Sequence, residues 1–464
     1  MKIKKIELKG YNQFKNVEID LTYPQGHEKA GQPLDKVCII GQSGTGKTSL
    51  LRLIKWFVSL QRDIGKNIQL PSPRKNAVKM HFQLSADRGL AGLSPIAYRM
   101  ANTDDFPYLR YEPDNIDKKR FFELLAIYFG EIKTLLINIP TEVLTDEKSP
   151  EPVNLINQTI EWEMLKKQKT VPVKLKPQHI IDFAIENLNK TWDYILNEIK
   201  EYRAQELSIN QSIMAMEALG KIEEKEKKKN EYKKWLAQNP DPLKILAERC
   251  LDPILVELGL KTKIDIDIDT IRNLGEIQYQ NLAGQDVPWN FLSTGTRQLI
   301  QSIIPLYQLK PRNAVILIDE PERSLYPDIQ KNIINHYIGQ APECQFFFAT
   351  HSPIIASSFE PWEIVELKFD SSYMSVYRDL QYEGENHVDN YKHYPQYLRW
   401  DSILERIFEL DEEGGEKRLR ALEKLAELEM RIKKLKQDSQ LDTSEGKKLI
   451  NEFKSLSQKV DWEF

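Results

Sequence analysis

The chain has 464 residues, of which 41% are hydrophobic and 29% are charged, enough for one large core with appendages. It contains no apolar run of the roughly 18 residues needed to cross a bilayer, which excludes an integral membrane protein. The net charge of -4 does not mark a general binder of polyanions, although a local basic groove is compatible with it. The charged N-terminal segment and the three widely spaced cysteines predict a cytoplasmic protein with reduced thiols.

The first 60 residues are predicted to form a hairpin, a buried strand and a helix. Apolar residues alternate through residues 2–21 around the turn at residues 10–12, as in a β-hairpin. The apolar run at residues 37–40 ends at Gly41 and is typical of a buried strand in a mostly parallel sheet. Apolar residues at helical spacing follow in residues 50–60.

Further strands are predicted on both sides of a long central region. The predicted strands are residues 77–84, 96–100, 108–112, 264–268, 275–279, 314–318 and 345–348. The first three favour a smaller antiparallel sheet beside the parallel one. The return of strands that alternate with helices after residue 260 indicates that the α/β core resumes there.

Two segments are predicted to be mainly helical. Between Pro177 and Pro240, apolar residues step by 4, 3, 4 and 3, as in a coiled coil or helical hairpin with limbs of roughly 30 residues. These residues are Leu188, Trp192, Ile195, Ile199 and Tyr202. After Trp400 the chain is again predicted to form helices, and one of them carries an apolar stripe from Leu419 to Ile432. Either another part of the chain or a docked effector is expected to cover that stripe.

We therefore predict an α/β protein with four parts. Residues 1–112 and 261–378 are the two lobes of a head with a mixed sheet. Residues 113–260 are an inserted helical arm, with a short coiled coil at about 178–238. Residues 379–464 are a helical tail.

The strongest local signal is the stretch GQSGTGKT from Gly41 to Thr48, which matches the phosphate-loop pattern. It lies between a predicted strand and a predicted helix, and this context disfavours an incidental glycine turn. In such a loop Lys47 reaches the β- and γ-phosphates and Thr48 offers a hydroxyl to Mg²⁺. The residues expected to bind ATP are Gln42, Ser43, Gly44, Thr45, Gly46, Lys47, Thr48 and Ser49.

An acidic pair, Asp319 and Glu320, follows the fully apolar strand predicted at residues 314–318. A carboxylate at this position projects at the carboxyl edge of the sheet, beside the phosphate loop. Asp319 is expected to hold Mg²⁺, and Glu320 to act as the general base for an attacking water. Such a pair is often only a turn, but the presence of Lys47 upstream favours the functional interpretation.

Two further motifs lie near this strand. Ser293, Gly295 and Gln298 belong to a small, hydroxyl-bearing stretch at a predicted helix start, which is either an ordinary N-cap or a second anion site. Because the chain already has a phosphate loop, a second site suggests that it serves the nucleotide of a partner subunit. His351 follows the strand at residues 345–348, where it could contact the γ-phosphate or the attacking water, although a lone histidine is more often structural.

Together these motifs resemble those of the ATP-binding-cassette (ABC) ATPases of the RecF, Rad50 and SMC branch, which also carry an inserted helical arm. The resemblance implies a head-to-tail homodimer, or a higher homo-oligomer, with Mg²⁺ and ATP between subunits. Ser293 and Gly295 would then act on the partner's nucleotide. The family's glutamine loop could contain Gln83 or Gln158.

Within that branch, residues 319–327 and the turn at residues 350–353 resemble ATPases of OLD and other anti-phage systems. OLD proteins continue into a Toprim nuclease, but the residues after His351 are predicted to be mostly helical, so we expect no nuclease domain here. Size and layout are similar to the ATPase subunits of the PARIS and Septu defence systems. The resemblance implies an ATP-driven sensor or scaffold that controls a separate toxic effector, such as a Toprim or HNH nuclease, with a phage protein as trigger.

Two other functions were weighed against this one. A RecF- or Rad50-like repair ATPase would clamp DNA directly; the short arm and the lack of a zinc-hook CxxC in it argue against Rad50, but not against RecF. The ATPase half of an ABC transporter is disfavoured by the inserted arm. An aromatic that stacks on adenine could be Tyr11 or Phe14, which fit equally well as hairpin core.

Overall fold

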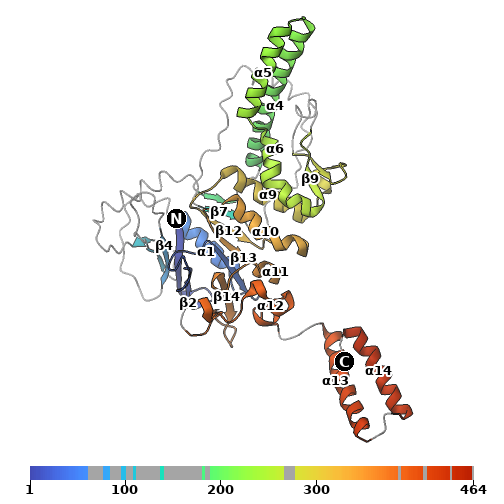
Figure 1. Ribbon diagram of the computed structural model, residues 1–464. Helices are drawn as coiled ribbons and strands as arrows, with labels where there is room; N and C mark the ends of the chain where they lie inside the picture. Colours follow the sequence, from blue (N-terminus) through green and yellow to red (C-terminus); the bar gives the residue numbers. More distant parts are fainter. Residues whose placement is uncertain are drawn as a thin grey trace. The chain divides into compact units, whose positions relative to one another are not determined.

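The computed structural model describes residues 1–60, 77–83, 96–100, 108–110, 136–139, 180–182, 189–265, 277–384, 388–410, 415–438 and 442–461. The chain divides into two compact units, Met1–Tyr397 and Leu398–Phe464 (Figure 1). Across these described ranges, no helix has the length and apolar character that a membrane span requires.

The first unit is built on a mixed sheet with 12 strands in the described residues. The strands are β1 (Lys2–Tyr11), β2 (Phe14–Asp20), β3 (Lys36–Gly41), β4 (Ala77–Gln83), β5 (Ile96–Met100), β6 (Tyr108–Arg110), β7 (Leu136–Ile139), β8 (Ile180–Asp182), β12 (Val315–Asp319), β13 (Gln345–Ala349), β14 (Ile364–Phe369) and β15 (Val376–Asp379). Their order is β6-β5-β4-β1-β2-β15-β14-β3-β13-β12-β7-β8. A smaller sheet contains β9 (Leu260–Thr262), β10 (Tyr279–Asn281) and β11 (Asp286–Val287).

The helices of the first unit surround this sheet and extend from it. They are α1 (Lys47–Leu60), α4 (Asn189–Ala218), α5 (Ile222–Gln238), α6 (Pro242–Leu246), η3 (Ala247–Leu251), α7 (Asp252–Leu255), η4 (Val256–Leu258), η5 (Trp289–Phe291), α9 (Thr294–Leu309), α10 (Pro327–Gln340), α11 (Pro353–Ala356), η6 (Pro361–Glu363), η7 (Val388–Asn390) and η8 (Pro395–Tyr397). The predicted α/β class, with a mixed sheet and a phosphate-loop core, is confirmed.

The sheet has a parallel half and an antiparallel half. From β14 to β8 each neighbouring pair is parallel, whereas β2, β1, β4, β5 and β6 pair in antiparallel fashion. Every residue of β12 and β13 is buried, as expected for strands covered on both faces. On one face of the sheet, Val315 and Leu317 share a core with α1. On the other face, the ring centroid of Phe348 lies 6.3 Å from that of Tyr337 of α10.

The fully buried Gln345 joins the two halves of the sheet. Its amide nitrogen donates to the carbonyls of Ile3 and Leu34, at 3.0 and 2.9 Å, and its amide oxygen accepts from the backbone N–H of Ile3 at 2.6 Å. A buried polar side chain is tolerated when its atoms are paired in this way. The start of β1 is therefore fixed against the start of β13.

The predicted hairpin arm consists of α4 and α5 (Figure 1). Gly220, with a φ of +70°, lies in the turn between them. Tyr202 of α4 stacks on Trp235 of α5, with their ring centroids 5.0 Å apart. No residue of α5 is buried, so the charged run at residues 223–229 lies on a solvated face. Arg203 of α4 pairs with Asp241, which caps the following helix.

Several parts of the chain differ from the sequence-based layout. β7 and β8 fall within residues 113–260, yet they extend the main sheet beyond β12. They are short apolar runs, for which periodicity alone does not distinguish strand from helix. Residues 266–276 lie outside the described residues, and they contain residues 266–268 of the strand predicted at 264–268 and residues 275–276 of the strand predicted at 275–279.

The second unit contains α12 (Trp400–Arg406), α13 (Glu416–Gln437) and α14 (Ser444–Val460). Leu425 and Leu428 of α13 form a small core with Phe453 and Val460 of α14. Another part of the chain therefore covers much of the apolar stripe on α13, which was the simpler of the two alternatives. This unit begins at Leu398, whereas the helical tail was predicted to begin at residue 379.

Candidate functional site

The carboxyl ends of the parallel strands bring together residues that are far apart in the sequence. β3 pairs with β13 and β13 pairs with β12, all in the same direction. The phosphate loop follows β3, Asp319 ends β12 and His351 follows β13. The first turn of α1, the acidic pair and the histidine therefore lie at one edge of the sheet.

The phosphate loop has a backbone that depends on its glycines. Gly46 has a φ of +93°, and a Cβ atom placed on it would lie 2.1 Å from the side-chain nitrogen of Gln13. A Cβ atom on Gly41 would lie 2.2 Å from the carbonyl oxygen of Leu367. Thr45 is fully buried, and its hydroxyl donates to the carbonyl of Gln42 at 2.8 Å. These contacts within the protein fix the backbone of the loop.

The exposure of the loop side chains divides them into two groups. Gln42, Ser43, Gly44 and Thr48 are exposed, Gly46 and Ser49 are half-buried, and Thr45 and Lys47 are buried. The open side of the loop therefore presents backbone and small polar groups, which is the arrangement by which such loops hold phosphates.

Lys47 points back into the loop. Its ammonium group donates to the carbonyl oxygens of Gly41 and Gln42, at 2.8 and 3.1 Å. Burial lowers the pKa of Lys47 to about 8, although the nearby carboxylates of Asp319 and Glu320 act in the opposite direction. A phosphate group could replace the two carbonyls as the partner of this cation, because an anion stabilises a desolvated charge more strongly than neutral dipoles do.

Thr48 and Asp319 make a direct contact between α1 and β12. The Thr48 hydroxyl donates to a carboxylate oxygen of Asp319 at 2.9 Å. Hydroxyl and carboxylate oxygens are the ligands that Mg²⁺ prefers, usually together with phosphate oxygens and water. The donor set at this contact therefore fits the metal that the sequence motifs imply.

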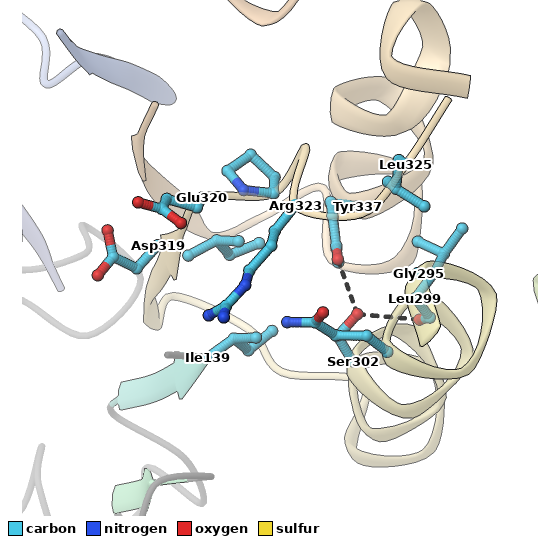
Figure 2. A pocket seen from close by; sticks show the side chains of 12 residues that line it. Ile139, Gly295, Leu299, Ser302, Asp319, Glu320, Arg323, Leu325 and Tyr337 are labelled. Atoms are coloured by element: carbon cyan, nitrogen blue, oxygen red, sulfur yellow. Dashed lines mark hydrogen bonds between the residues drawn. The ribbon is translucent and has the colours of Figure 1, made fainter. Parts of the chain in front are cut away.

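Glu320 is held in an unusual backbone conformation. Its φ is +50°, in the left-handed region that residues other than glycine seldom adopt. The backbone N–H of Glu320 donates to the carbonyl of Ala349 at the end of β13, at 2.8 Å. Figure 2 shows its carboxylate beside that of Asp319. Such conformations persist where the surrounding structure enforces them, often at functional sites.

Glu322 was not among the site residues predicted from the sequence, yet it organises the turn that carries His351. One of its carboxylate oxygens accepts from the Thr350 hydroxyl at 2.7 Å and from the backbone N–H of His351 at 2.9 Å. Its other oxygen is buried without a hydrogen-bond partner. Burial raises the pKa of Glu322, and these two hydrogen bonds oppose that shift. Its position two residues after Glu320 marks Glu322 as a candidate site residue, whereas its role follows only from its contacts in the folded protein.

The turn after β13 is further tied to α10. The Ser352 hydroxyl donates to the side-chain oxygen of Gln330 at 2.7 Å, and the Gln330 nitrogen donates to the carbonyl of Leu325 at 2.9 Å. His351 itself is exposed. Partial burial and the positive charge of Lys47 lower its pKa, while the carboxylates of the acidic pair raise it. His351 follows β13, which is parallel to β3, so it lies at the same edge of the sheet as the phosphate loop.

Ser293 is the N-cap of α9, where its hydroxyl accepts from the backbone N–H of Thr296 at 3.1 Å. Gly295 packs against the turn that follows the acidic pair: a Cβ atom on it would lie 2.1 Å from the carbonyl oxygen of Ser324. The close approach of these two segments therefore requires a glycine at position 295.

A small cavity of about 20 Å³, room for roughly one water, lies behind this contact. Gly295 and Gln298 line it together with Asp319, Glu320 and Arg323. Figure 2 shows Arg323 extending between the acidic pair and Ser302. Among the described residues, none of those that line the cavity belongs to the phosphate loop. The structure thus brings Gly295 and Gln298 to the acidic turn.

Tyr11 and Phe14, the two aromatic residues expected to stack on adenine, differ in burial. Phe14 is fully buried in the core and is not accessible for stacking on adenine. Tyr11 is half-buried and packs against the same core. The side chain of Gln83 and all of Gln158 lie outside the described residues, so the glutamine loop is not located.

The role of Glu322 can be tested through stability. We expect Glu322→Ala to lower the free energy of unfolding by about 1–3 kcal/mol, because it leaves two donors without an acceptor. Glu322→Gln keeps an acceptor oxygen and removes the buried charge. Because the folded protein raises the pKa of Glu322, the wild type should lose stability as the pH rises from about 4.3, the usual glutamate value, through the raised pKa. The glutamine variant should lack this loss.

Urea unfolding of both variants and the wild type between about pH 4 and pH 8 measures the difference. The stability of Glu322→Gln should increase relative to that of the wild type as the pH rises. Parallel pH profiles for these two proteins would contradict a buried charge at this position.

Comparison with known proteins gives a family and a set of distant structural likenesses. Among solved structures, an SMC head bound to the C-winged helix domain of ScpA shares 14% identity over 82% of this chain and 97% of that chain, with a TM-score of 0.40. An SMC head with an extended coiled coil, bound to the C-terminal domain of ScpA derived from Pyrococcus furiosus, shares 13% sequence identity over 82% of this chain and 96% of that chain, with a TM-score of 0.37. The SMC head domain from Thermotoga maritima shares 10% sequence identity over 82% of this chain and 99% of that chain, with a TM-score of 0.36.

The family assignment rests on a match between the sequence and a family model. The model of the AAA ATPase domain matches residues 1–356, which include the phosphate loop, the acidic pair and His351. This range covers more than half of the chain. The protein therefore belongs to the AAA ATPase domain family.

Proposed function

We propose that this protein binds ATP with Mg²⁺ at the carboxyl edge of its parallel strands and hydrolyses it. The observation that carries the proposal is the junction of phosphate loop and acidic strand. There, the Lys47 ammonium lies against two loop carbonyls and the Thr48 hydroxyl lies 2.9 Å from Asp319. The family match supports the same activity.

Each residue at the edge has a proposed role. Lys47 and the loop N–H groups would bind the β- and γ-phosphates, and Thr48 and Asp319 would hold the metal. The metal, when bound, supplies positive charge to the phosphate oxygens. The Glu320 carboxylate would accept a proton from the water that attacks the γ-phosphorus, as the bond to the β-phosphate oxygen breaks. His351, which follows β13 at the same edge of the sheet, would contact the γ-phosphate side of the site.

Substitution of Glu320 separates binding from turnover. Glu320→Gln should retain ATP binding and lose hydrolysis by at least about a hundredfold, within the range of a general base. Lys47→Ala should lose both. Glu343→Gln, which changes an exposed glutamate outside this edge, serves as the matched control. Phosphate release and nucleotide binding are the measurements, and near-normal hydrolysis by Glu320→Gln would remove Glu320 from this role.

We further propose that two copies of the chain share each site, with Ser293, Gly295 and Gln298 of one copy facing the nucleotide of the other. The start of α9 is an anion-binding type of helix terminus, and its N-cap residue Ser293 is exposed, where another copy could reach it. Two large aromatic side chains lie close in sequence to Ser293 and to the Ser324 turn that contacts Gly295. Phe291 is 77% exposed and Tyr326, two residues after Ser324, is 72% exposed. Exposed aromatic residues around a polar site are typical of protein interfaces.

Mixing inactive variants tests this arrangement. Lys47→Ala chains and Ser293→Arg chains should each lack ATPase activity, but their mixture forms heterodimers in which one site keeps both intact halves. About a quarter of the activity of an equal amount of wild type should return if chains exchange freely, because about half of the dimers are then mixed and each has one of its two sites intact.

Thr443→Arg, which alters the N-cap of α14, controls for the loss of a cap in the Ser293 variant. Proof of heterodimers by differential tags is needed. If heterodimers form and no activity returns, the shared site is wrong.

The biological role that fits these features best is a sensor or scaffold that controls a separate toxic effector in anti-phage defence, as the resemblance of residues 319–327 and 350–353 suggests. ATP-dependent closure of two heads would change how firmly the effector, a Toprim or HNH nuclease, is held. The neighbouring reading frame discriminates between roles. A nuclease there would support defence, whereas replication or repair genes would favour a DNA-clamping ATPase.

A further inference from the structure

We propose that the turn between β14 and β15 carries a nucleobase platform, on which the base of the bound nucleotide stacks against Tyr373. This inference rests on the proposed nucleotide binding and adds to it the part of the site that holds the base. The ligand class is a nucleoside triphosphate, and ATP is the nucleotide used to test it. The platform consists of Phe369, Asp370, Tyr373 and Met374.

The turn lies directly beside the phosphate loop. β14 is parallel to β3, with Leu367 opposite Gly41, so the chain after Leu367 continues past the same edge as the loop. A Cβ atom on Gly44 would lie 3.5 Å from the ring of Phe369. The turn between β1 and β2 lies beside the start of β15, because the backbone N–H of Val376 donates to the carbonyl of Gln13 at 2.8 Å.

The direction of a bound nucleotide follows from the strand order. β3 lies between β14 on one side and β13 and β12 on the other. The Thr48–Asp319 contact fixes the metal and γ-phosphate end toward β12. A triphosphate that lies in the loop with this polarity extends its ribose and base toward the opposite side, where β14 and its turn are found.

The turn carries an exposed aromatic ring, Tyr373, next to the half-buried ring of Phe369. Phe369 is half-buried and packs against the main core. Its ring centroid lies 5.7 Å from that of Tyr373, which is 70% exposed, and the neighbouring Met374 is 83% exposed. Bases stack well on exposed aromatic side chains, whose faces accept any base. By contrast Phe14, the earlier candidate, is fully buried.

Hydrogen bonds hold Tyr373 in a conformation that an aromatic residue seldom adopts. Its φ is +55°, in the left-handed region. The Asp370 carboxylate accepts from the hydroxyls of Ser372 and Ser375 and from the backbone N–H of Met374, at 2.8, 2.7 and 3.0 Å. The backbone N–H of Tyr373 donates to the Asp370 carbonyl at 2.9 Å. The ring is thus carried on a turn that is already ordered, which limits the entropy lost on stacking.

The test compares a ligand that has a base with one that lacks it. Affinities of the full-length protein for ATP and for inorganic tripolyphosphate, both with Mg²⁺, are measured by titration calorimetry. Tyr373→Asn removes the ring and suits the left-handed backbone, so the turn should persist. We expect this variant to bind ATP about tenfold more weakly, within the range for stacking of one base, and to bind tripolyphosphate as the wild type does.

Two variants complete the design. Tyr373→Phe should keep the wild-type affinity for ATP because it keeps the ring. Tyr397→Ala removes another exposed tyrosine, at the end of the first compact unit. It should change neither the affinity for ATP nor that for tripolyphosphate.

The outcomes distinguish this inference from the proposed function. A wild type that binds neither ligand would overturn the nucleotide site itself, and the platform with it. If the wild type binds ATP and Tyr373→Asn binds it equally well, the platform is wrong and the exposed turn serves another contact. Equal weakening of ATP and tripolyphosphate would also overturn it, because the turn would then support only the phosphate loop.

Discussion

The hydrogen bond from Thr48 to Asp319 is the contact on which the proposed site depends. It joins the first turn of α1 to the end of β12, across 271 positions of sequence, at 2.9 Å. The contact is possible because β3, β13 and β12 run in the same direction and end at one edge. Buried strands of this kind require cover on both faces, which α1 and α10 provide, so the geometry of the site and the packing of the core have the same origin.

Two charges at this edge are stabilised by neighbouring groups of the chain itself. Lys47 is buried against loop carbonyls, and Glu322 is buried against Thr350 and the backbone of His351. Burial disfavours the charged form of each and shifts their pKa values in opposite directions, downward for the lysine and upward for the glutamate. The lysine lies beside the exposed residues 42–44 of the phosphate loop, whereas the carboxylate of Glu322 is buried. This difference favours ligand binding for the first and positioning of the His351 turn for the second.

The sequence predicts the parts of this protein that local rules determine. The phosphate loop, the apolar strand before Asp319 and the hairpin at residues 2–21 each follow a short pattern, and the α/β class follows from their alternation. The role of Glu322 could not be predicted in this way, because its partners at Thr350 and His351 become neighbours only through the parallel pairing of β12 and β13. The burial of Phe14 likewise depends on tertiary packing, since an aromatic residue at a hairpin turn suits both core and ligand contact.

The most direct test of the central claim is a crystal structure of the Glu320→Gln variant with ATP and Mg²⁺. The proposed site predicts the triphosphate within residues 42–48 and the metal beside Thr48 and Asp319. It also predicts that the Lys47 ammonium leaves the carbonyls of Gly41 and Gln42, where it lies at 2.8 and 3.1 Å, for phosphate oxygens. A nucleotide bound elsewhere, with Lys47 still on both carbonyls, would contradict the proposal.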